Sequence, residues 1–240
     1  MANEWQKPLD VDGKNLRILG KGSNQVLFSV QQPGVPFRWE QIVQSNGNIF
    51  AARTLPIIVP EDVPDRLQRS VLELIHWATP ARCAALFIHE KRPYPALVKD
   101  AVGETLCEMP GGIIEASDVS VASAAVREFL EEIGADPKRV LAQMPLLSVP
   151  APVSAGAQIE GQSLYCVVYR AQNEFRPTTD EPIAKVNVVP LTEAYRWLLG
   201  RHERREECTE MKTLLALLIL QEEYRRAYGV SFYAKKEVAE

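Results

Sequence analysis

The chain has 240 residues, of which 46% are hydrophobic and 24% are charged. These fractions are typical of a globular protein with enough apolar residues to build a substantial core. The formal net charge is only −4, from 27 basic and 31 acidic residues, so overall charge gives no argument for a nucleic acid or an anionic membrane as partner. Any anionic substrate must therefore be bound by a local group of residues.

The four cysteines lie far apart and form neither a C-x-x-C metal pair nor a dense disulfide framework. This spacing favours reduced, buried thiols in a cytoplasmic protein. The N-terminus, "MANEWQKPLDVDGKNL", contains no apolar run of the signal-peptide kind, and the strongest apolar run, "MKTLLALLIL", is too short to span a bilayer. We expect a soluble cytoplasmic protein with no membrane partner.

The first part of the chain predicts β-structure. Residues 24–30, 37–43 and 48–55 are short apolar runs separated by turn signals such as "QQPGVP" and "SNGN". The Pro-rich segment "LPIIVPEDVPD", residues 55–65, is expected to interrupt any regular element. We therefore predict a β-rich N-terminal subdomain at residues 1–65 and a main domain at residues 66–240.

The main domain begins with mixed elements. The runs "SVLELIHWA" and "CAALFIHEKR" are of β-type and are joined by a short "TPAR" turn, which predicts paired strands, and "GETLCEMP" predicts another strand. Residues 120–133 predict a helix, with Ser120 as its cap and Gly134 as its stop.

The remaining elements follow in the same mixed order. "SLYCVVYRA" predicts a strand, "AKVNVVPLTEAYRWLLG" a strand running into a helix, and "EECTEMKTLLALLILQEEYRRAYG" a terminal amphipathic helix. Strands and helices do not alternate as steady βαβ units, so we expect an α+β fold, an α/β/α sandwich around a mixed sheet.

The central helix carries three acidic residues, Glu128, Glu131 and Glu132, in its last two turns. Each helical residue advances about 100°, so the three carboxylates share one face. Like charges repel there by about 0.2–0.5 kcal/mol a pair, and the negative end of the helix dipole disfavours acidic side chains. The glycines upstream, Gly111 and Gly112, can expose backbone carbonyls, which Mg²⁺ accepts together with carboxylates and phosphates. The pattern favours a divalent metal held against a diphosphate over the alternative of a solvated acidic face.

The whole stretch "MPGGIIEASDVSVASAAVREFLEEIGA" resembles the Nudix box, G-x5-E-x7-R-E-U-x-E-E-x-G-U, where U is aliphatic. The second half matches except for Phe129 and Ala135 at the U positions. The resemblance implies the Nudix fold, with the α/β/α arrangement that the element pattern also predicts.

The first half of the box departs from the pattern by one inserted residue. Counting forward from Gly112, the first Glu of the box falls on Asp118; counting back from Arg127, it falls on Val119. The Glu has therefore become Asp or has been lost. In the family this Glu usually supports the Arg of the box, so the departure bears on loop geometry and activity more than on metal binding.

The resemblance covers roughly residues 70–220. "CAALFIHEKRPYP", "LCEMPGGIIE" and "SAGAQIE" resemble segments of the ADP-ribose pyrophosphatase-like subgroup. That subgroup uses a small N-terminal β subdomain for dimer formation, and residues 1–65 are its expected counterpart here. The terminal helix is apolar on more than one face, which is compatible with a subunit contact. We therefore expect a homodimer.

The resemblance also implies roles for individual residues. It makes Glu128 and Glu132 direct metal ligands, has Glu131 ligate a further metal directly or through water, and has the Gly112 carbonyl complete the shell. Arg127 would orient the carboxylates. The metal would be Mg²⁺ or Mn²⁺.

Four further positions are candidates with open alternatives. Glu115 corresponds to a loop Glu near the metals. Glu160 lies on a loop that often supplies the base activating water, and an exposed loop Glu is an equal reading. Lys91 and Arg92 are candidates for binding substrate phosphate, or form an ordinary charged strand end.

The other candidate side chains have simpler readings. The three histidines, His76, His89 and His202, are dispersed, which favours packing or surface roles over metal ligation. Trp39 is a candidate for stacking on a base, although packing is the simpler reading.

Three functions remain open from the sequence. The preferred one is metal-dependent hydrolysis of a nucleoside diphosphate linked to another moiety, with ADP-ribose or another NDP-sugar giving a nucleoside monophosphate and a sugar phosphate. The second is a catalytically weak nucleotide sensor, and the third is a purely structural module. The C-terminal runs "HERREECTE" and "EEYRRAYG" mix both charges, so no nucleic-acid partner is expected.

Overall fold

The computed structural model describes residues 9–11, 14–21, 25–31, 38–44, 49–64, 69–91, 105–115, 117–147, 151–152, 160–177, 183–204 and 208–233. The chain divides into two compact units. The N-terminal unit comprises residues 1–50 and 151–162, and the main unit comprises residues 51–150 and 163–240.

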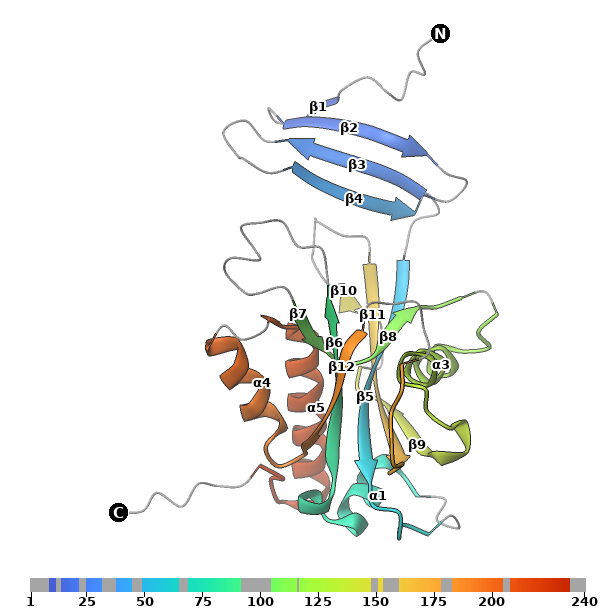
Figure 1. The fold of residues 1–240 in the computed structure, drawn as a ribbon, viewed down its shortest axis with the longest axis vertical. Helices are drawn as coiled ribbons and strands as arrows, with labels where there is room; N and C mark the ends of the chain where they lie inside the picture. Colours follow the sequence, from blue (N-terminus) through green and yellow to red (C-terminus); the bar gives the residue numbers. More distant parts are fainter. Residues whose placement is uncertain are drawn as a thin grey trace. The chain divides into compact units, whose positions relative to one another are not determined.

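The N-terminal unit contains a four-stranded antiparallel sheet in the order β1-β2-β3-β4 (Figure 1). Its strands are β1 (Leu9–Val11), β2 (Lys14–Lys21), β3 (Gln25–Gln31) and β4 (Arg38–Gln44). The strands predicted at residues 24–30 and 37–43 are thus confirmed, whereas β1 and β2 were not predicted. The side chains of this sheet, including that of Trp39 in β4, lie outside the described part.

A second, mixed sheet has the strand order β10-β11-β5-β6-β7-β13, and most of its strands belong to the main unit. In addition, β12 pairs with β6, β8 with β5, and β9 with β11. The pair β7–β13 is parallel, and β5–β6, β6–β7 and β6–β12 are antiparallel. The strands are β5 (Ile49–Val59), β6 (Ala84–Lys91), β7 (Thr105–Glu108), β8 (Gly111–Ile113), β9 (Val140–Pro145), β10 (Ala151–Pro152), β11 (Glu160–Arg170), β12 (Ile183–Pro190) and β13 (Cys208–Thr209).

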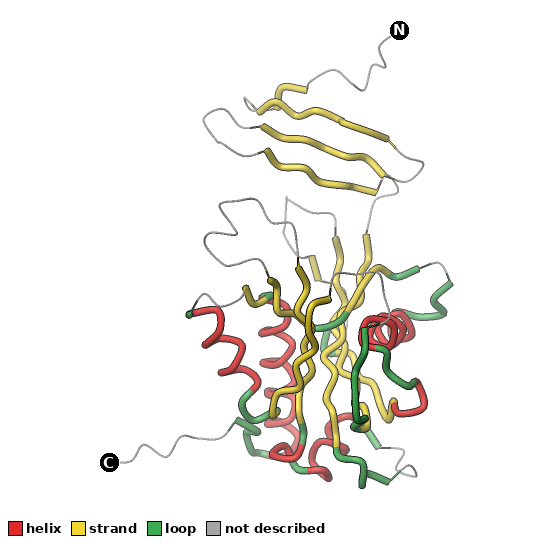
Figure 2. The backbone as a smooth tube through the Cα atoms, viewed as in Figure 1, coloured by secondary structure: helices red, strands yellow, loops and turns green. Residues whose placement is uncertain are grey.

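Helices cover both faces of this sheet (Figures 1 and 2). On one face lie α1 (Val71–Ala78), α4 (Ala194–Glu203) and α5 (Met211–Tyr228), and on the other lies α3 (Val121–Ile133). The side-chain alternation of β6 explains the layers, because Phe87 packs with the first group of helices while Leu86 and Ile88 pack with α3. The predicted α/β/α sandwich around a mixed sheet is confirmed.

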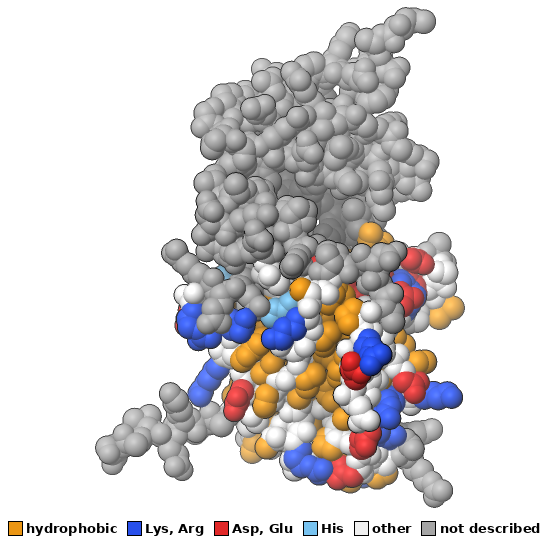
Figure 3. Space-filling model, in the orientation of Figure 1, with side chains coloured by type: hydrophobic (Ala, Val, Ile, Leu, Met, Phe, Trp, Pro, Cys, Tyr) orange, Lys and Arg blue, Asp and Glu red, His pale blue; other side chains and the backbone are white. Residues whose placement is uncertain are grey.

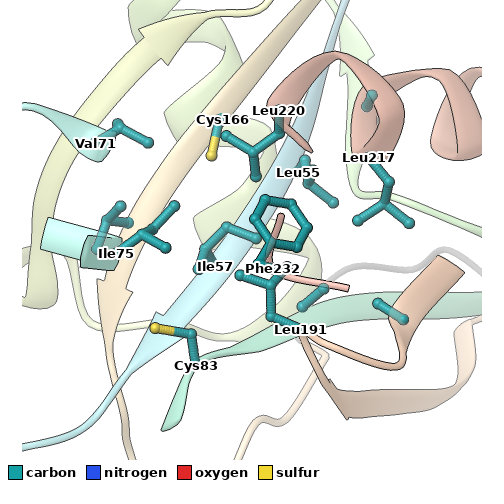
Figure 4. Close-up of a cluster of buried hydrophobic side chains, with 14 of the residues drawn as sticks. Leu55, Ile57, Val71, Ile75, Cys83, Cys166, Leu191, Leu217, Leu220 and Phe232 are labelled. Carbon is teal, nitrogen blue, oxygen red and sulfur yellow. The ribbon is translucent and has the colours of Figure 1, made fainter. Parts of the chain in front are cut away.

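The larger core lies between the sheet and the α1, α4 and α5 layer. Figure 4 shows part of this core, where side chains from β5, such as Leu55 and Ile57, meet Leu217 and Leu220 from α5. Three cysteines, Cys83, Cys107 and Cys166, are buried, as the sequence predicts. No described helix is both long enough and apolar enough to cross a bilayer.

The strand predicted at residues 70–78 is wrong, because this segment forms helix α1. Its buried residues, Val71, Leu74, Ile75 and Ala78, follow the helical spacing i, i+3, i+4, i+7. Ser70 caps the helix by accepting from the backbone N–H of Glu73, whose carboxylate accepts from the Ser70 N–H. This capping box marks a helix start that a reading based on apolar content alone overlooks.

The expected interruption at residues 55–65 is wrong for its first half, because β5 continues to Val59. Pro56 is tolerated where β5 changes partners: residues 51–53 pair with β8, and residues 57–58 pair with β6. The two compact units divide after Phe50, and residues of β5 such as Leu55 and Ile57 contribute to the core of the main unit. The predicted domain boundary at residue 65 stays a prediction.

The other predicted elements of the main unit are confirmed in kind. The predicted strands appear as β6, β7, β11 and β12, and the predicted helices appear as α3, α4 and α5. The short strands β8, β9 and β13 were not predicted. Strand β8 contains Gly111 and Gly112 together with Ile113.

Candidate active site

Helix α3 is fixed at both ends by local interactions. Ser120 accepts from the Ser123 N–H at 3.0 Å, and the Ser123 hydroxyl accepts from the Ser120 N–H at 2.9 Å. At the other end, Gly134 adopts the left-handed conformation, with φ 60°. The buried ring of Phe129 packs edge-on against Tyr169 of the sheet, with ring centroids 5.4 Å apart. These contacts set which residues of α3 face β8.

Two of the three acidic residues on α3 lie against the glycines of β8. Glu132 is only 2% exposed, and its Oε2 accepts a hydrogen bond from the Gly111 N–H at 3.0 Å. A Cβ added to Gly112 would lie 2.5–2.6 Å from the carboxylate atoms of Glu128. The absence of a side chain at Gly112 therefore leaves room for the Glu128 carboxylate beside the strand.

Arg127 joins the acidic residues to the loop before the helix. Its Nη1 lies 2.9 Å from Glu128 Oε1 and 3.0 Å from Glu131 Oε2. Its Nη2 donates to the Ile113 carbonyl oxygen at 3.1 Å. Hydrogen bonding to Asp118, together with the nearby carboxylates, raises the pKa of Arg127, so the guanidinium stays charged. The predicted role of Arg127 in orienting carboxylates fits these contacts.

The structure distinguishes the two alternatives, Asp118 and Val119, for the position of the first Glu of the box. Arg127 binds Asp118 with both ends of its fork, Nε to Oδ1 at 3.0 Å and Nη2 to Oδ2 at 2.9 Å. Val119, the other alternative, is 94% exposed. Asp118 therefore takes the place beside Arg127 that the resemblance gives to the first Glu of the box.

The stability that Asp118 contributes is expected to depend on pH. Hydrogen bonds from Arg127, and then one from the Glu115 N–H, lower the pKa of Asp118. A lowered pKa contributes stability above the pKa of an unfolded Asp, about 3.9, and that contribution is lost as pH falls through the folded pKa. Asp118→Asn should therefore lower the urea midpoint at pH 7, and the difference from wild type should shrink below about pH 4.

Val119→Ala is the matched control for Asp118→Asn, because Val119 is exposed in the same loop. Urea unfolding curves at several pH values should show no effect of this control. A pH-independent difference for Asp118→Asn, or an equal effect of Val119→Ala, would contradict the assignment of Asp118.

The third acidic residue, Glu131, is separated from the other two. Its side chain is 52% exposed and pairs with Arg127, whereas Glu128 is 14% exposed. Glu131 lines an open groove of about 690 Å³ between α3 and β9. Three carboxylates on one face were predicted, and the described side chains instead bring two of them to β8 and turn the third toward this groove.

The remaining candidates are described only in part. The backbone N–H of Glu115 donates to Asp118 Oδ2 at 2.8 Å, and its exposed carboxylate accepts from Ser117 at 3.1 Å. The side chains of Lys91 and Glu160 lie outside the described part, as does the whole of Arg92. Their proposed roles in binding phosphate and activating water remain predictions.

The histidines have packing roles in the described structure. His76 Nδ1 lies 3.0 Å from the Tyr224 hydroxyl, and His89 is buried. His202 Nδ1 accepts from the Thr209 N–H at 3.4 Å. These contacts agree with the packing roles that the sequence favours.

Sequence reasoning missed a buried ion pair beneath the site. Arg53 Nη1 donates to Glu108 Oε2 at 2.9 Å, and the Glu108 side chain is completely buried. The signal for Glu108 was its place at the start of "EMPGG", directly before the glycines. Arg53 carried no signal, because it lies 55 residues away in a strand whose partners are set by the fold.

The oxygen donors beside β8 fit a hard divalent cation. Among the described residues, no group of three or more His, Cys, Asp and Glu side chains is arranged to hold a metal ion. The donors here are the carboxylates of Glu128 and Glu132, which both lie against β8, and the Gly112 carbonyl is the third oxygen that the Nudix resemblance implies. Mg²⁺ is commonly bound through one or two carboxylates while water and substrate phosphates supply its other ligands.

Three solved structures illustrate the similarity to known proteins. The Nudix hydrolase RenU from M. smegmatis has 13% identity and a TM-score of 0.44, covering 73% of this chain and 85% of that one. The NUDIX domain of Shewanella oneidensis NrtR, complexed with ADP ribose, has 12% identity and a TM-score of 0.46, covering 73% and 88%. A C. elegans Ap4A hydrolase has 10% identity and a TM-score of 0.43, covering 75% and 99%.

The comparison with curated proteins gives no significant match. The family assignment therefore depends on a family model, which is described as the NUDIX domain and matches residues 79–210. That range contains α3, β8 and the Arg127–Asp118 pair, and it is more than half of the chain. The chain belongs to the Nudix family.

Proposed function

We propose that this protein is a metal-dependent hydrolase that cleaves a diphosphate joining a nucleoside to another moiety, with ADP-ribose or another NDP-sugar as substrate. The observation that carries the proposal is the convergence of Glu128 and Glu132 on the glycines of β8, beside Arg127. Acidic side chains near the C-terminal end of a helix are disfavoured unless cations balance them. Arg127 supplies one positive charge beside these carboxylates. A divalent cation bound for the proposed hydrolysis would balance the remaining negative charge.

The chain's residues have distinct roles in this proposal. Glu128, Glu132 and the Gly112 carbonyl would hold Mg²⁺ or Mn²⁺, which when bound neutralises phosphate charge and lowers the pKa of water. Arg127 keeps the Glu128 carboxylate in place, and the Gly111 N–H does the same for Glu132. Phosphoryl transfer depends on positioning and charge stabilisation more than on a protein nucleophile. The arrangement therefore needs no Ser-His-Asp triad.

The choice between hydrolase and sensor depends on the first half of the box. The sensor alternative was motivated by the inserted residue and the missing Glu. In the structure Asp118 binds Arg127 through two hydrogen bonds and so supplies the support expected of that Glu. This pair supports an enzyme with a working Arg127 over a site that has lost its geometry.

A direct assay tests the proposal. Purified protein with Mg²⁺ or Mn²⁺ is incubated with ADP-ribose, other NDP-sugars and dinucleotides, and the products are separated by chromatography. We expect ADP-ribose to yield AMP and ribose 5-phosphate only when the metal is present. If calorimetry showed binding of ADP-ribose without turnover of any substrate, the sensor would be supported instead. If the protein showed no binding and no turnover, the structural module would be the remaining function.

We further propose that the protein is a homodimer. Helix α5 exposes Met211, Leu215 and Leu218 at the spacing i, i+4, i+7, which places them along one side of the helix. Hydrophobic side chains also gather around β12 on the face shown in Figure 3, where Val188 is exposed. Light scattering should give twice the mass of 26.9 kDa, and Leu215→Glu with Leu218→Glu should reduce it to the monomer mass. A monomeric wild type would contradict this proposal.

A further inference from the structure

A network of charged residues lies beneath the glycines of β8, outside the box motif. Arg53 in β5 pairs with the buried Glu108 in β7, at 2.9 Å. On its other side, Arg53 Nη2 lies 3.9 Å from Oε1 of Glu210, the residue that precedes α5. Lys212 Nζ lies 2.7 Å from the same Glu210 oxygen. The network therefore links β5, β7 and the start of α5 at one place.

Arg53 is in direct contact with the site strand. Arg53 pairs with Gly111 in the β5–β8 ladder. A Cβ added to Gly111 would lie 2.7 Å from Cδ of Arg53 and 2.4 Å from the Ala52 carbonyl oxygen, so the two strands are in close contact here. The Gly111 N–H donates to Glu132, so a shift of Arg53 would move Gly111 and, with it, the Glu132 carboxylate.

The segment between β7 and β8 is also held from the α5 side. The Met109 N–H donates to the Thr213 hydroxyl at 3.0 Å, and this hydroxyl lies 3.3 Å from Glu210 Oε2. From β5, the Thr54 N–H donates to the Pro110 carbonyl oxygen at 2.8 Å. Hydrogen bonds from α5 and β5 thus hold the backbone of Met109 and Pro110, and the charged network links these two elements.

A buried ion pair is weak evidence for stability, because desolvating both charges offsets their attraction, and an apolar pair of similar size often stabilises equally well. A pair that lies against Gly111 can instead fix the backbone of Gly111 and of the adjacent Gly112. We propose that Arg53 and Glu108 are positioning residues that hold Gly111 and Gly112, and through them Glu132, in the geometry that binds the divalent cation. This inference rests on the proposed function for the identity of the cation.

The test measures Mn²⁺ binding to the purified, nucleotide-free protein by electron paramagnetic resonance, so that it does not depend on turnover. Glu108→Gln keeps the shape of the side chain and removes its charge. We expect it to weaken Mn²⁺ binding by about 10- to 100-fold, the usual effect of losing a residue that supports metal ligands. The exposed pair Arg82–Asp62 supplies the control, and Asp62→Asn should leave Mn²⁺ binding unchanged.

A second variant separates positioning from folding. Arg53→Met combined with Glu108→Leu replaces the ion pair by apolar side chains, which removes the risk of leaving one charge buried alone. We expect this double variant to unfold at the wild-type temperature or above and still to bind Mn²⁺ at least about tenfold more weakly.

The outcomes distinguish this inference from the proposed function. Wild-type affinity for Mn²⁺ in the well-folded double variant, or weakening that appears only when the melting temperature falls, would overturn the positioning role. A wild-type protein that binds no Mn²⁺ would overturn it as well. Mn²⁺ binding that responds to these substitutions, in a protein that hydrolyses no diphosphate, would refute the proposed activity and leave the positioning role standing.

Discussion

Glu132→Gln is expected to reduce turnover of the proposed diphosphate substrate by at least about 10²- to 10³-fold, the usual effect of removing one preorganised group that stabilises the transition state. Glutamine keeps the shape of the side chain and an oxygen that can accept the Gly111 N–H, so the fold should be retained. It loses the negative charge that would bind the cation. Steady-state kinetics in Mg²⁺, with a thermal melt of each protein, measures the two effects separately.

Glu131→Gln is the matched control on the same helix. Glu131 is half exposed and pairs with Arg127, and exposed pairs of this kind contribute little, about 0.3–0.5 kcal/mol. We expect its loss of turnover to be at least about tenfold smaller than that of Glu132→Gln. Equal losses would show that Glu131 turns toward β8 when the cation binds, and that the division of the carboxylates argued above is wrong. Full activity of Glu132→Gln would show that the catalytic metal does not bind to this helix.

What the sequence predicts well in this protein is local. Helix α3 begins at a serine cap and ends at a left-handed glycine, and both signals lie within a few residues of the ends they mark. The same kind of signal was available for α1 in Ser70 and Glu73. The apolar run of α1, however, is too short for its length to distinguish a helix from a strand. Short apolar segments are therefore where local reasoning fails first.

What could not be predicted depends on contacts between distant residues. Strand β5 continues through Pro56 because the sheet gives it a different partner on each side of that residue, and the sequence does not show this exchange. The inserted residue of the box left Asp118 and Val119 as alternatives, and the contact of Arg127 with Asp118 distinguishes them. Arg53 is the clearest case, since only the β5–β8 ladder brings it to Gly111.

Gly112→Ala is expected to reduce turnover by about 10²-fold, because a displacement of about 1 Å in a catalytic group can have an effect of this size. The added Cβ would lie 2.5 Å from the Glu128 carboxylate, closer than real contacts allow, so the carboxylate must move away from the strand. The backbone of Gly112 is not in the left-handed region, and alanine can adopt its conformation. The loss should therefore appear in kcat and in the half-saturating concentration of Mg²⁺, with only a small change in melting temperature.

Gly200→Ala in α4 shows how a harmless glycine replacement behaves in the same protein. Its Cβ would meet only the end of the Arg204 side chain, at 3.1 Å, which can move. Alanine in a helix is favoured over glycine by about 0.5–1 kcal/mol, so this variant should melt at or above the wild-type temperature with unchanged kinetics. If Gly112→Ala kept wild-type kinetics as well, the Glu128 carboxylate would have no required position beside β8. The proposed cation would then have to bind elsewhere, because the proposed site requires the Glu128 carboxylate to lie beside Gly112.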